Sequence, residues 1–504
     1  MNVRELNREG AGRTGPPAAG GAGRGSDAAR RRYHDERVAH WDDVAGRFGA
    51  REGWGGEYHR RLAEVYGSLV PPGKRVLEIG CGQGDLLSSL KPSSGVGVDF
   101  SAEMVARARA RHPEIEFVCA DAHDLPLEDT YDFIVLSDLV NDIWDVQEVF
   151  RQVRRLSHPA TRLVLNFYSR VWELPLGAAR RAGLAKPLRP QNWLTVSDVA
   201  GLLALEDFEV IRRREEVLLP LRVPPLSTFA NRCLAKIFPF NLLTLTHVLV
   251  ARPAGPPEVL IGEEEGPLVS VVVPARNEAG NVASVFARTP ELGAGTELIF
   301  VEGGSTDDTY EVIEREIAAR PERRCVLLRQ EGEGKGDAVR LGFAHATGDV
   351  LAILDCDLTV PPEDLPRFVE VLRSGKGDFA NGSRLVYPLE REAMRHLNLL
   401  GNKFFSLAFS WLLGQPIKDT LCGTKVLRRA DYEAIAANRA QFGDFDPFGD
   451  FDLLFGAAKL NLKIVDVPVR YRERAYGETN IARWRHGWLL LRMVAFAARR
   501  IKFV

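Results

Sequence analysis

Two aspartates one residue apart, Asp355 and Asp357, follow an aliphatic run in the stretch GDVLAILDCDLTV. In an extended strand alternate side chains face the same way, so both carboxylates can converge on one point. Two adjacent negative charges repel each other, and a divalent cation would relieve that repulsion. The same spacing occurs twice more, at Asp444/Asp446 and Asp450/Asp452. The spacing therefore indicates a candidate metal site, and the neighbouring segments must decide which pair forms it.

A glycine-rich turn in KRVLEIGCGQGDLLSSL supplies a second group of candidate residues. Gly80, Gly82 and Gly84 follow an expected strand and let the backbone turn tightly and approach a ligand. Their spacing differs from the dinucleotide motif G-x-G-x-x-G, so a pyrophosphate is not the ligand that it indicates. Asp99 ends the next expected strand, where a carboxylate can accept hydrogen bonds from ribose hydroxyls. Asp121, after the third expected strand, would lie beside an adenine, so this block is predicted to bind a nucleotide-like cofactor.

Strands that alternate with helical segments must position both groups. This alternation starts afresh twice, at RVLEIGCGQG near residue 75 and at LVSVVVPARNE near residue 268, and it predicts two parallel-sheet α/β domains. The segment 253–267 between them is rich in Pro, Gly and Glu, which is typical of an interdomain linker. A length of 504 residues agrees with more than one domain.

Composition restricts the class of protein further. A hydrophobic fraction of 45% with 27% charged residues is ordinary for globular protein, and a net charge of -2 gives no reason to expect a nucleic-acid partner. The six cysteines are far apart, which favours a reducing compartment without structural disulfides. Residues 1–30 are rich in Gly, Ala and Arg and are expected to be disordered, with no secretory signal. The longest apolar stretches are shorter than the ~20 residues that cross a bilayer.

The first block resembles the class I S-adenosylmethionine-dependent methyltransferases, across about residues 55–252. The resemblance implies a Rossmann-like fold for residues 31–252 and S-adenosylmethionine as the cofactor. The residues that it implies for cofactor binding are Glu78, Gly80, Gly82, Gly84, Asp99, Asp121 and Ala122. The methyl acceptor cannot be read from the sequence. Four residues are candidate bases by position only, and capping or solvated roles are favoured for each, so none is assigned: His123, Asp138, Asp142 and His158.

The second block has four polar groups in order, each after an expected strand or in a glycine-rich loop: SVVVPARNEAGNV, TELIFVEGGSTDDT, GEGKGDAVRLGF and VLAILDCDLTV. Open α/β sheets bind ligands at the carboxyl ends of their strands. This set resembles the family 2 glycosyltransferases of GT-A fold, and FANGSRLV, KDTLCGTKVLRR and VDVPVRYRERAYGETN narrow the resemblance to the dolichyl- or polyprenyl-phosphate mannose synthase branch. A GT-A domain is therefore expected at 268–482.

The resemblance implies a role for each matching residue. Asp355 and Asp357 would hold Mg²⁺ or Mn²⁺ on the diphosphate of a nucleotide sugar and act in catalysis, whereas the other two Asp pairs are favoured as turn or helix-cap acids. The residues implied for donor binding are Pro274, Arg276, Glu278, Glu302 and Lys335. The residues implied for phosphate binding are Arg384, Lys425, Arg472, Arg474 and Thr479.

Four residues depart from the family pattern. Glu302 and Gly303 stand where two Asp are common, and Lys425 stands where Arg is frequent. Thr359 stands where some relatives place a further metal ligand, so the nucleotide and the metal geometry stay open. A phosphate monoester has a second pKa of about 6, so a polyprenyl phosphate could attack without a base. A sugar hydroxyl would need one, and Asp450 or Asp452 lies roughly where such relatives carry it, which keeps a hydroxyl acceptor as the alternative.

The leading hypothesis is a bifunctional enzyme that transfers a sugar to a polyprenyl-phosphate-type lipid and methylates a substrate of the same pathway. The alternative of another class is that one domain is catalytically silent and serves in binding. Segment 483–504 carries arginines around an apolar run with Trp484 and Trp488 at helical spacing. It is expected to dock on a membrane surface without crossing it, or otherwise to pack on the protein's own core. The expected location is the cytoplasm, peripheral at the inner face of the membrane.

Overall fold

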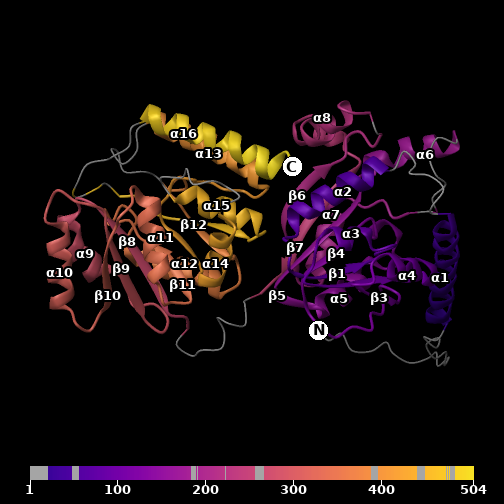
Figure 1. The fold of residues 1–504 in the computed structure, drawn as a ribbon, viewed down its shortest axis with the longest axis horizontal. Coiled ribbons are helices and arrows are strands. Elements are labelled where there is room, and N and C mark those ends of the chain that lie inside the picture. The colour runs from indigo at the N-terminus through magenta and orange to yellow at the C-terminus, as the bar shows by residue number, and fades with distance from the viewer. Residues whose placement is uncertain are drawn as a thin grey trace, which may run out of the picture.

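The computed structural model describes most of the chain and contains two α/β sheets (Figure 1). The described residues are 21–47, 56–182, 189, 191–221, 223–255, 266–387, 396–439, 449–472, 474, 476 and 483–504. Asp444, Asp446 and Thr479 lie outside them, and so does the side chain of Asp450. Neither sheet shares a strand with the other, and the predicted α/β class with a Rossmann-like sheet and a second sheet is confirmed.

The first sheet has seven strands in the order β3-β2-β1-β4-β5-β7-β6. All neighbours are parallel except β7, which runs antiparallel to both β5 and β6. The strands are β1 (Arg75–Ile79), β2 (Ser94–Asp99), β3 (Glu116–Cys119), β4 (Tyr131–Leu136), β5 (Ser157–Tyr168), β6 (Phe208–Glu216) and β7 (Thr246–Pro253). The helices are α1 (Gly21–Arg47), α2 (Gly56–Leu69), α3 (Asp85–Ser89), α4 (Ala102–Arg111), α5 (Val146–Arg155), α6 (Glu173–Arg181), α7 (Val196–Leu205) and α8 (Leu226–Arg232).

Helix α5 shows why these segments fold as they do. Val146, Val149, Phe150 and Val153 recur at helical spacing and are all buried against the sheet. The Asp145 side chain accepts a hydrogen bond from the backbone amide of residue 148 and so caps the helix start.

The second sheet also has seven strands, in the order β10-β9-β8-β11-β13-β12-β14. Strand β13 runs antiparallel to β11 and β12, and the other neighbours are parallel. The strands are β8 (Val269–Ala275), β9 (Thr296–Glu302), β10 (Arg324–Arg329), β11 (Val350–Ile353), β12 (Phe379–Ser383), β13 (Lys425–Arg428) and β14 (Ile464–Pro468). The helices are α9 (Ala279–Arg288), α10 (Thr309–Ala319), α11 (Lys335–His345), α12 (Leu365–Arg373), α13 (His396–Leu413), α14 (Arg429–Ala437), α15 (Asp450–Lys459) and α16 (Arg483–Ala497).

The N-terminal segment differs from the prediction, and the C-terminal segment packs as one of the two expected alternatives. Helix α1 begins at Gly21, so residues 21–30 are helical, where the sequence predicted disorder up to residue 30. At the other end, α16 continues into a π-helical turn (Ala498–Lys502), and Leu490, Met493, Ala497 and Ile501 are buried in the core of the second sheet. One face of the C-terminal segment therefore packs on the protein itself. No helix in the described ranges is long and apolar enough to cross a bilayer.

The two sheets meet through a polar interface around Asp378. Its carboxylate accepts hydrogen bonds from Arg162 of β5 and Arg252 of β7, each at 2.8 Å, and from Arg428 of β13 at 3.1 Å. Asn461, after α15, donates to the backbone carbonyl of Leu69 at 2.8 Å. These contacts fix the position of the second sheet relative to the first.

Candidate active sites

The first site begins at the glycine turn after β1. Gly80 and Gly84 have φ angles of 76° and 77°, in the left-handed region that favours glycine. A Cβ added at Gly80 would collide with Leu139, and one added at Gly84 would collide with Phe117. The turn therefore needs glycine both for its conformation and for the close approach of these neighbours.

Asp99 ties this turn to the end of β2. One carboxylate oxygen accepts the Gly82 amide at 2.9 Å, and the other accepts the Ser101 amide at 2.9 Å. Burial raises the pKa of Asp99, and the amide hydrogen bonds oppose the increase. Each oxygen has a second lone pair, so the predicted ribose contact remains open to Asp99 in addition to its structural role.

Glu78 is the buried acid below the same turn. Its side chain is 2% exposed, and Oε2 has no hydrogen-bond partner among the described residues. Burial raises the pKa of Glu78 to about 8, and the nearby Asp99 adds to the increase. A buried oxygen without a partner is unfavourable by about 1–3 kcal/mol, and the amino group of S-adenosylmethionine would supply a donor. The residues present therefore fit that cofactor, which would supply the methyl group when bound.

Replacing Asp99 by Ala is expected to weaken S-adenosylmethionine binding by one or more orders of magnitude. The loss of a charged acceptor costs about 1.5–3 kcal/mol, and the Gly82 amide would also lose its partner. Calorimetric titration of the variant measures the change. An Asp129→Ala variant is the control, because Asp129 is 82% exposed and lies near Arg75, away from the glycine turn. Unchanged affinity in Asp99→Ala would contradict the assignment.

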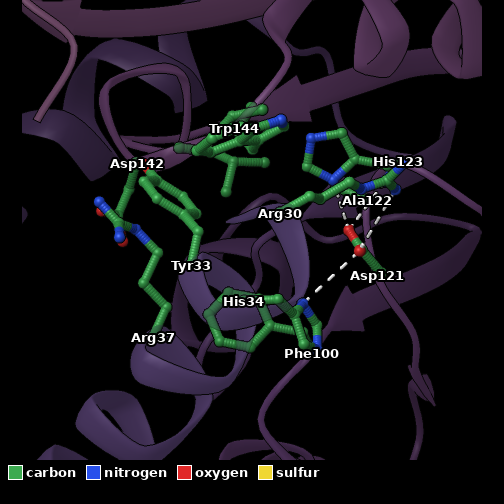
Figure 2. Close-up of a pocket in the computed structure, with 12 residues that line it drawn as sticks. Arg30, Tyr33, His34, Arg37, Phe100, Asp121, Ala122, His123, Asp142 and Trp144 are labelled. Atoms are coloured by element: carbon green, nitrogen blue, oxygen red, sulfur yellow. Dashed lines mark hydrogen bonds and ion pairs between the residues drawn. The ribbon is translucent and has the colours of Figure 1, made fainter. Parts of the chain in front are cut away.

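Asp121 and Ala122 line a small pocket under α1 (Figure 2). Asp121 accepts hydrogen bonds from the backbone amide of His123 at 3.0 Å and bonds its ring Nδ1 at 2.6 Å. Burial opposes ionisation of Asp121, but the His123 contacts and the nearby His34 lower its pKa to about 2. The carboxylate therefore stays charged beside the predicted adenine position.

Helix α1 covers this pocket. That contact was not predicted from the sequence. Arg37 and Trp41 both donate to Asp142, at 2.8 and 3.1 Å, and Tyr33 contacts Trp144 edge to face at 5.0 Å. Tyr33, Arg37 and Trp41 are spaced by four residues, so they lie on one face of the helix. That spacing was the available signal, although nothing local to it indicates what the face would contact.

Three of the four candidate bases make hydrogen bonds that order a turn or hold α1. Both ring nitrogens of His123 are used, by Asp121 and by the Asp145 amide. His158 accepts the backbone amide of residue 160, and Asp142 binds α1. Capping and structural roles account for these three side chains.

Asp138 differs from the other three. It has a φ of 54°, which is strained for a residue other than glycine, at the turn that places Leu139 against Gly80. Its carboxylate accepts hydrogen bonds from Tyr58 at 2.6 Å and Asn166 at 2.5 Å. Burial raises the pKa of Asp138, and these hydrogen bonds oppose the increase. Among the four, Asp138 is the one held beside the glycine turn by a buried polar cluster.

The second site lies where β8, β9 and β11 end. Asp355 pairs with Lys335, at 2.5 Å between Oδ1 and Nζ. Asp357 pairs with Arg474 at 2.6 Å, and its other oxygen accepts two hydrogen bonds from Thr359. The structure thus brings four of the predicted residues together, each acid beside a cation.

The charges of this site act on one another. Burial would raise the pKa of Asp355, but Lys335, Lys425 and Arg384 outweigh it, and the pKa is lowered. Burial raises the pKa of Glu278 to about 7, and the nearby Asp357 and Asp355 add to the increase. Arg474 Nη1 lies 3.9 Å from Glu278 Oε1, so Arg474 lies between two acids of the site.

Gly423 was not singled out from the sequence, although it lies against the acid pair. A Cβ added there would collide with both the Asp355 carboxylate and Lys335 Nζ. Substitution at Gly423 would therefore displace the Asp355–Lys335 pair.

The predicted donor residues lie at the shared edge of β8 and β9. Pro274 and Glu302 belong to these strands, and Ala275 pairs with Glu302 in register. Glu302 accepts the Ser305 amide at 2.5 Å, while Arg276 and Glu278 follow β8 directly. Their arrangement agrees with a nucleoside pocket, and their role stays a prediction.

The predicted phosphate-binding residues have different surroundings. Arg384 makes a bidentate pair with Asp419, at 2.7 and 2.9 Å, and Lys425 is fully buried with Nζ donating to the Cys422 carbonyl at 2.5 Å. The Arg472 amide donates to the Thr359 carbonyl at 2.9 Å, which places its segment beside Asp357. The charges of Arg384 and Lys425 reach Asp355.

The acid pair fits a divalent cation of the kind predicted. No cluster of three or more His, Cys, Asp or Glu suited to a metal is present in the described ranges. Mg²⁺, however, is commonly bound by one or two carboxylates, with substrate phosphates and water as its other ligands. Asp355 and Asp357 offer oxygen donors alone, which suit Mg²⁺ and Mn²⁺.

Asp450 and Asp452 were the two candidate general bases for a hydroxyl acceptor, and the side chain of Asp452 is the one that the structure describes. It is 7% exposed, and its carboxylate accepts a hydrogen bond from Arg439 at 2.6 Å. An ion pair therefore accounts for this side chain.

Comparison with known proteins identifies both parts of the chain. The model "Glycosyl transferase family 2" matches residues 270–435, and the model "Methyltransferase domain" matches residues 76–160. A dolichyl-phosphate hexose transferase of Haloferax volcanii is 32% identical over 213 residues, 42% of this chain and 86% of that protein. A dolichol-phosphate mannosyltransferase of Pyrococcus furiosus is 31% identical over 218 residues, 42% of this chain and 59% of that protein.

Among solved structures, a putative methyltransferase of Haloferax volcanii in complex with its Trm112 activator is 18% identical, with a TM-score of 0.33, and covers 42% of this chain and 97% of its own. Several curated relatives are matched over only about half of their length, such as a low-salt glycan biosynthesis hexosyltransferase of the same organism at 53%. The predicted fusion of a methyltransferase with a glycosyltransferase is confirmed. Through its C-terminal half the chain belongs to glycosyltransferase family 2, and its N-terminal half carries a methyltransferase domain.

Proposed function

We propose that this chain transfers a sugar from a nucleotide-sugar donor to a polyprenyl-phosphate-type lipid, and that its methyltransferase domain methylates a substrate of the same pathway. The observation that carries the proposal is the meeting of Asp355, Lys335, Asp357 and Arg474 at the carboxyl edge of the second sheet. The relatives named for transfer to dolichyl or dolichol phosphate support the class of acceptor.

A divalent cation bound at Asp355 and Asp357 would neutralise the leaving nucleoside diphosphate. Lys335 and Arg474 hold the two acids in place, and both cations lie where a diphosphate would share them. Arg presents a planar fork to phosphate, and Lys presents a point charge. These residues therefore supply positive charge at the position of the leaving group.

A phosphate acceptor also agrees with the surroundings of Asp452. With a second pKa of about 6, an acceptor phosphate is largely ionised at neutral pH and needs no base. Arg439 forms an ion pair with Asp452 and so occupies the carboxyl that a hydroxyl acceptor would use. The hydroxyl acceptor is therefore the less favoured alternative.

The outward face of α16 is the part of this helix that we propose to contact the membrane. Trp488 is 66% exposed, and Leu491 and Arg492 are also exposed, whereas the opposite face is part of the core. Deleting 483–504 would therefore open the core, so substitutions on the outward face are the suitable test. We place the protein in the cytoplasm, at the inner face of the membrane.

With polyprenyl phosphate as acceptor, one radiolabelled sugar from a panel of UDP- and GDP-sugars is expected to enter the organic phase. The reason is that a lipid-linked sugar partitions with its lipid. Polyprenol, which lacks the phosphate, is the matched control acceptor and should give no labelled lipid. Labelling of polyprenol or of a glycolipid hydroxyl, without labelling of polyprenyl phosphate, would contradict the proposal and support the hydroxyl alternative.

A further inference from the structure

We propose that the segment between β6 and β7 of the methyltransferase domain, residues 217–245, forms one lipid-facing surface with α13 and α16, as its described residues 217–221 and 223–245 indicate. Through this surface both domains would bind an anionic phospholipid bilayer. The inference deepens the proposed membrane attachment and rests on it, because it assigns a second anchor in the other domain.

The segment 217–245 exposes many large apolar side chains. Eight of them are between 42% and 75% exposed: Val223, Leu226, Phe229, Ile237, Phe238, Phe240, Leu242 and Leu243. Single exposed apolar residues are ordinary, but a contiguous patch of this kind marks a protein or membrane contact.

The polarity of this segment is inverted relative to a helix in water. In α8 the small polar residues Ser227 and Asn231 are buried, whereas Leu226 and Phe229 point outward. Asn231 bonds both the amide and the carbonyl of Leu219 at 2.8 Å, so its buried position is fixed by hydrogen bonds. A water-exposed helix normally buries its apolar stripe. The inversion therefore predicts an apolar neighbour outside the protein.

The second domain continues this surface. Trp411 of α13 donates from its indole nitrogen to the Lys236 carbonyl at 3.0 Å, which joins α13 to the segment 217–245. Phe404, Leu407 and Trp411 are exposed and spaced by three and four residues, so they form one stripe. Lys502, after α16, lies 5.2 Å from the centre of the Trp411 ring. In Figure 1, α13, α16 and α8 lie along one edge of the molecule.

The methyltransferase domain extends the same edge beyond α8. Trp172 donates to the Leu243 carbonyl at 2.9 Å, and its neighbours Val171 and Leu174 are exposed. Figure 1 places α6, which contains Leu174, on the same side as α8. The apolar surface therefore spans both domains.

Charge selects a lipid bilayer as the occupant. The segments 217–245, 396–413 and 483–504 contain no Asp or Glu, although the whole chain has 68 acidic residues. Among the side chains that the structure describes on these segments, the exposed cations are Lys403, Arg492, Arg499 and Arg500. A second copy would bring like charges together, whereas anionic headgroups would meet these cations while aromatic side chains enter the interface. A bilayer thus matches both the apolar and the charged residues.

Flotation of the full-length protein with vesicles tests this inference. The wild-type chain is expected to float with phosphatidylglycerol-containing vesicles and to float less with pure phosphatidylcholine or at high salt, because salt screens the headgroup attraction. In the double variant Phe238→Asp and Leu242→Asp, the fraction bound should fall at least fivefold. Val326→Asp is the matched control, because Val326 is an exposed residue of edge strand β10, and its binding should equal that of wild type.

Two readouts separate the outcomes. Binding of S-adenosylmethionine checks that the double variant is folded; if it is not, the milder Phe238→Ser variant must show the loss. Transfer to a short-chain polyprenyl phosphate in detergent should be unchanged in all these variants. Wild-type flotation by the folded variant would overturn the inference, as would a wild-type chain that binds no anionic vesicle. If the wild-type chain transfers no sugar to polyprenyl phosphate, that result contradicts the proposed function, whatever the flotation result.

Discussion

Replacing Asp355 or Asp357 by Ala is expected to abolish glycosyl transfer while S-adenosylmethionine binding survives. Both carboxylates stand beside the cations proposed to receive the leaving diphosphate, and the two binding sites belong to different sheets. Loss of a metal ligand removes several kcal/mol of stabilisation from the developing charge. Because about 1.36 kcal/mol corresponds to a tenfold change in rate, the rate should fall by at least about a hundredfold.

Initial rates of transfer to polyprenyl phosphate measure this effect, with calorimetry for S-adenosylmethionine on the same preparation. Asp349→Ala is the matched control, because Asp349 is exposed and precedes β11 at the end opposite to Asp355. Removal of metal by EDTA should abolish wild-type transfer, and Mg²⁺ or Mn²⁺ should restore it. Full transfer by an enzyme shown to be free of metal would contradict metal binding by these two acids. Their remaining role would then be to position Lys335 and Arg474.

The position of this site at a sheet edge could be predicted because its signals are local. Each polar group directly follows an aliphatic strand, and the carboxyl ends of neighbouring parallel strands meet at one edge. The partner of each acid was not predictable in the same way. Arg474 lies 117 residues after Asp357, and only the folded sheet brings them to 2.6 Å. The pattern of strands predicts at which edge of the sheet the acids lie, whereas the cation that pairs with each acid depends on how the loops fold.

Helix α1 shows the opposite limit. Its first residues, GAGRGSDAA, contain glycines that disfavour a helix, so local propensity predicted disorder. Tertiary contacts stabilise the later turns, among them the pairs that Arg37 and Trp41 make with Asp142. A helix held mainly by polar contacts over a pocket carries no wide apolar stripe, so the usual signal is missing.

The interface between the domains was likewise invisible in the sequence. Arg162 and Arg252 occur in strands, where an arginine is usually taken as solvent-facing, yet both are 3% exposed on their side chains. They are buried because they meet Asp378 of the other sheet. Nothing local in a strand tells which of its faces another domain will cover.

Replacing Asp378 by Ala is expected to lower the thermal stability of the chain strongly. The carboxylate is 4% exposed and accepts hydrogen bonds from three guanidinium groups and from the Lys463 amide. Burial would raise the pKa of Asp378, but Arg162, Arg252 and Arg428 outweigh it and lower the pKa. A carboxylate with a lowered pKa stabilises the fold above its unfolded pKa of about 3.9, and this contribution is lost as the pH falls through the folded value. At pH 7 the stabilisation is therefore fully present.

Removing one partner from a buried ionic cluster costs about 3–5 kcal/mol, because the remaining charges stay buried without compensation. For domains of this size 1 kcal/mol moves Tm by about 2–4 °C, so Tm should fall on the order of 10 °C in differential scanning fluorimetry. Asp129→Ala is the control, since Asp129 is 82% exposed and lies 4.0 Å from Arg75, and its Tm should stay near that of wild type. Asp378→Asn, which keeps an acceptor oxygen, should fall between the two. If Tm in Asp378→Ala equals that of wild type, the three arginines do not depend on this carboxylate, and the polar interface does not hold the two sheets together.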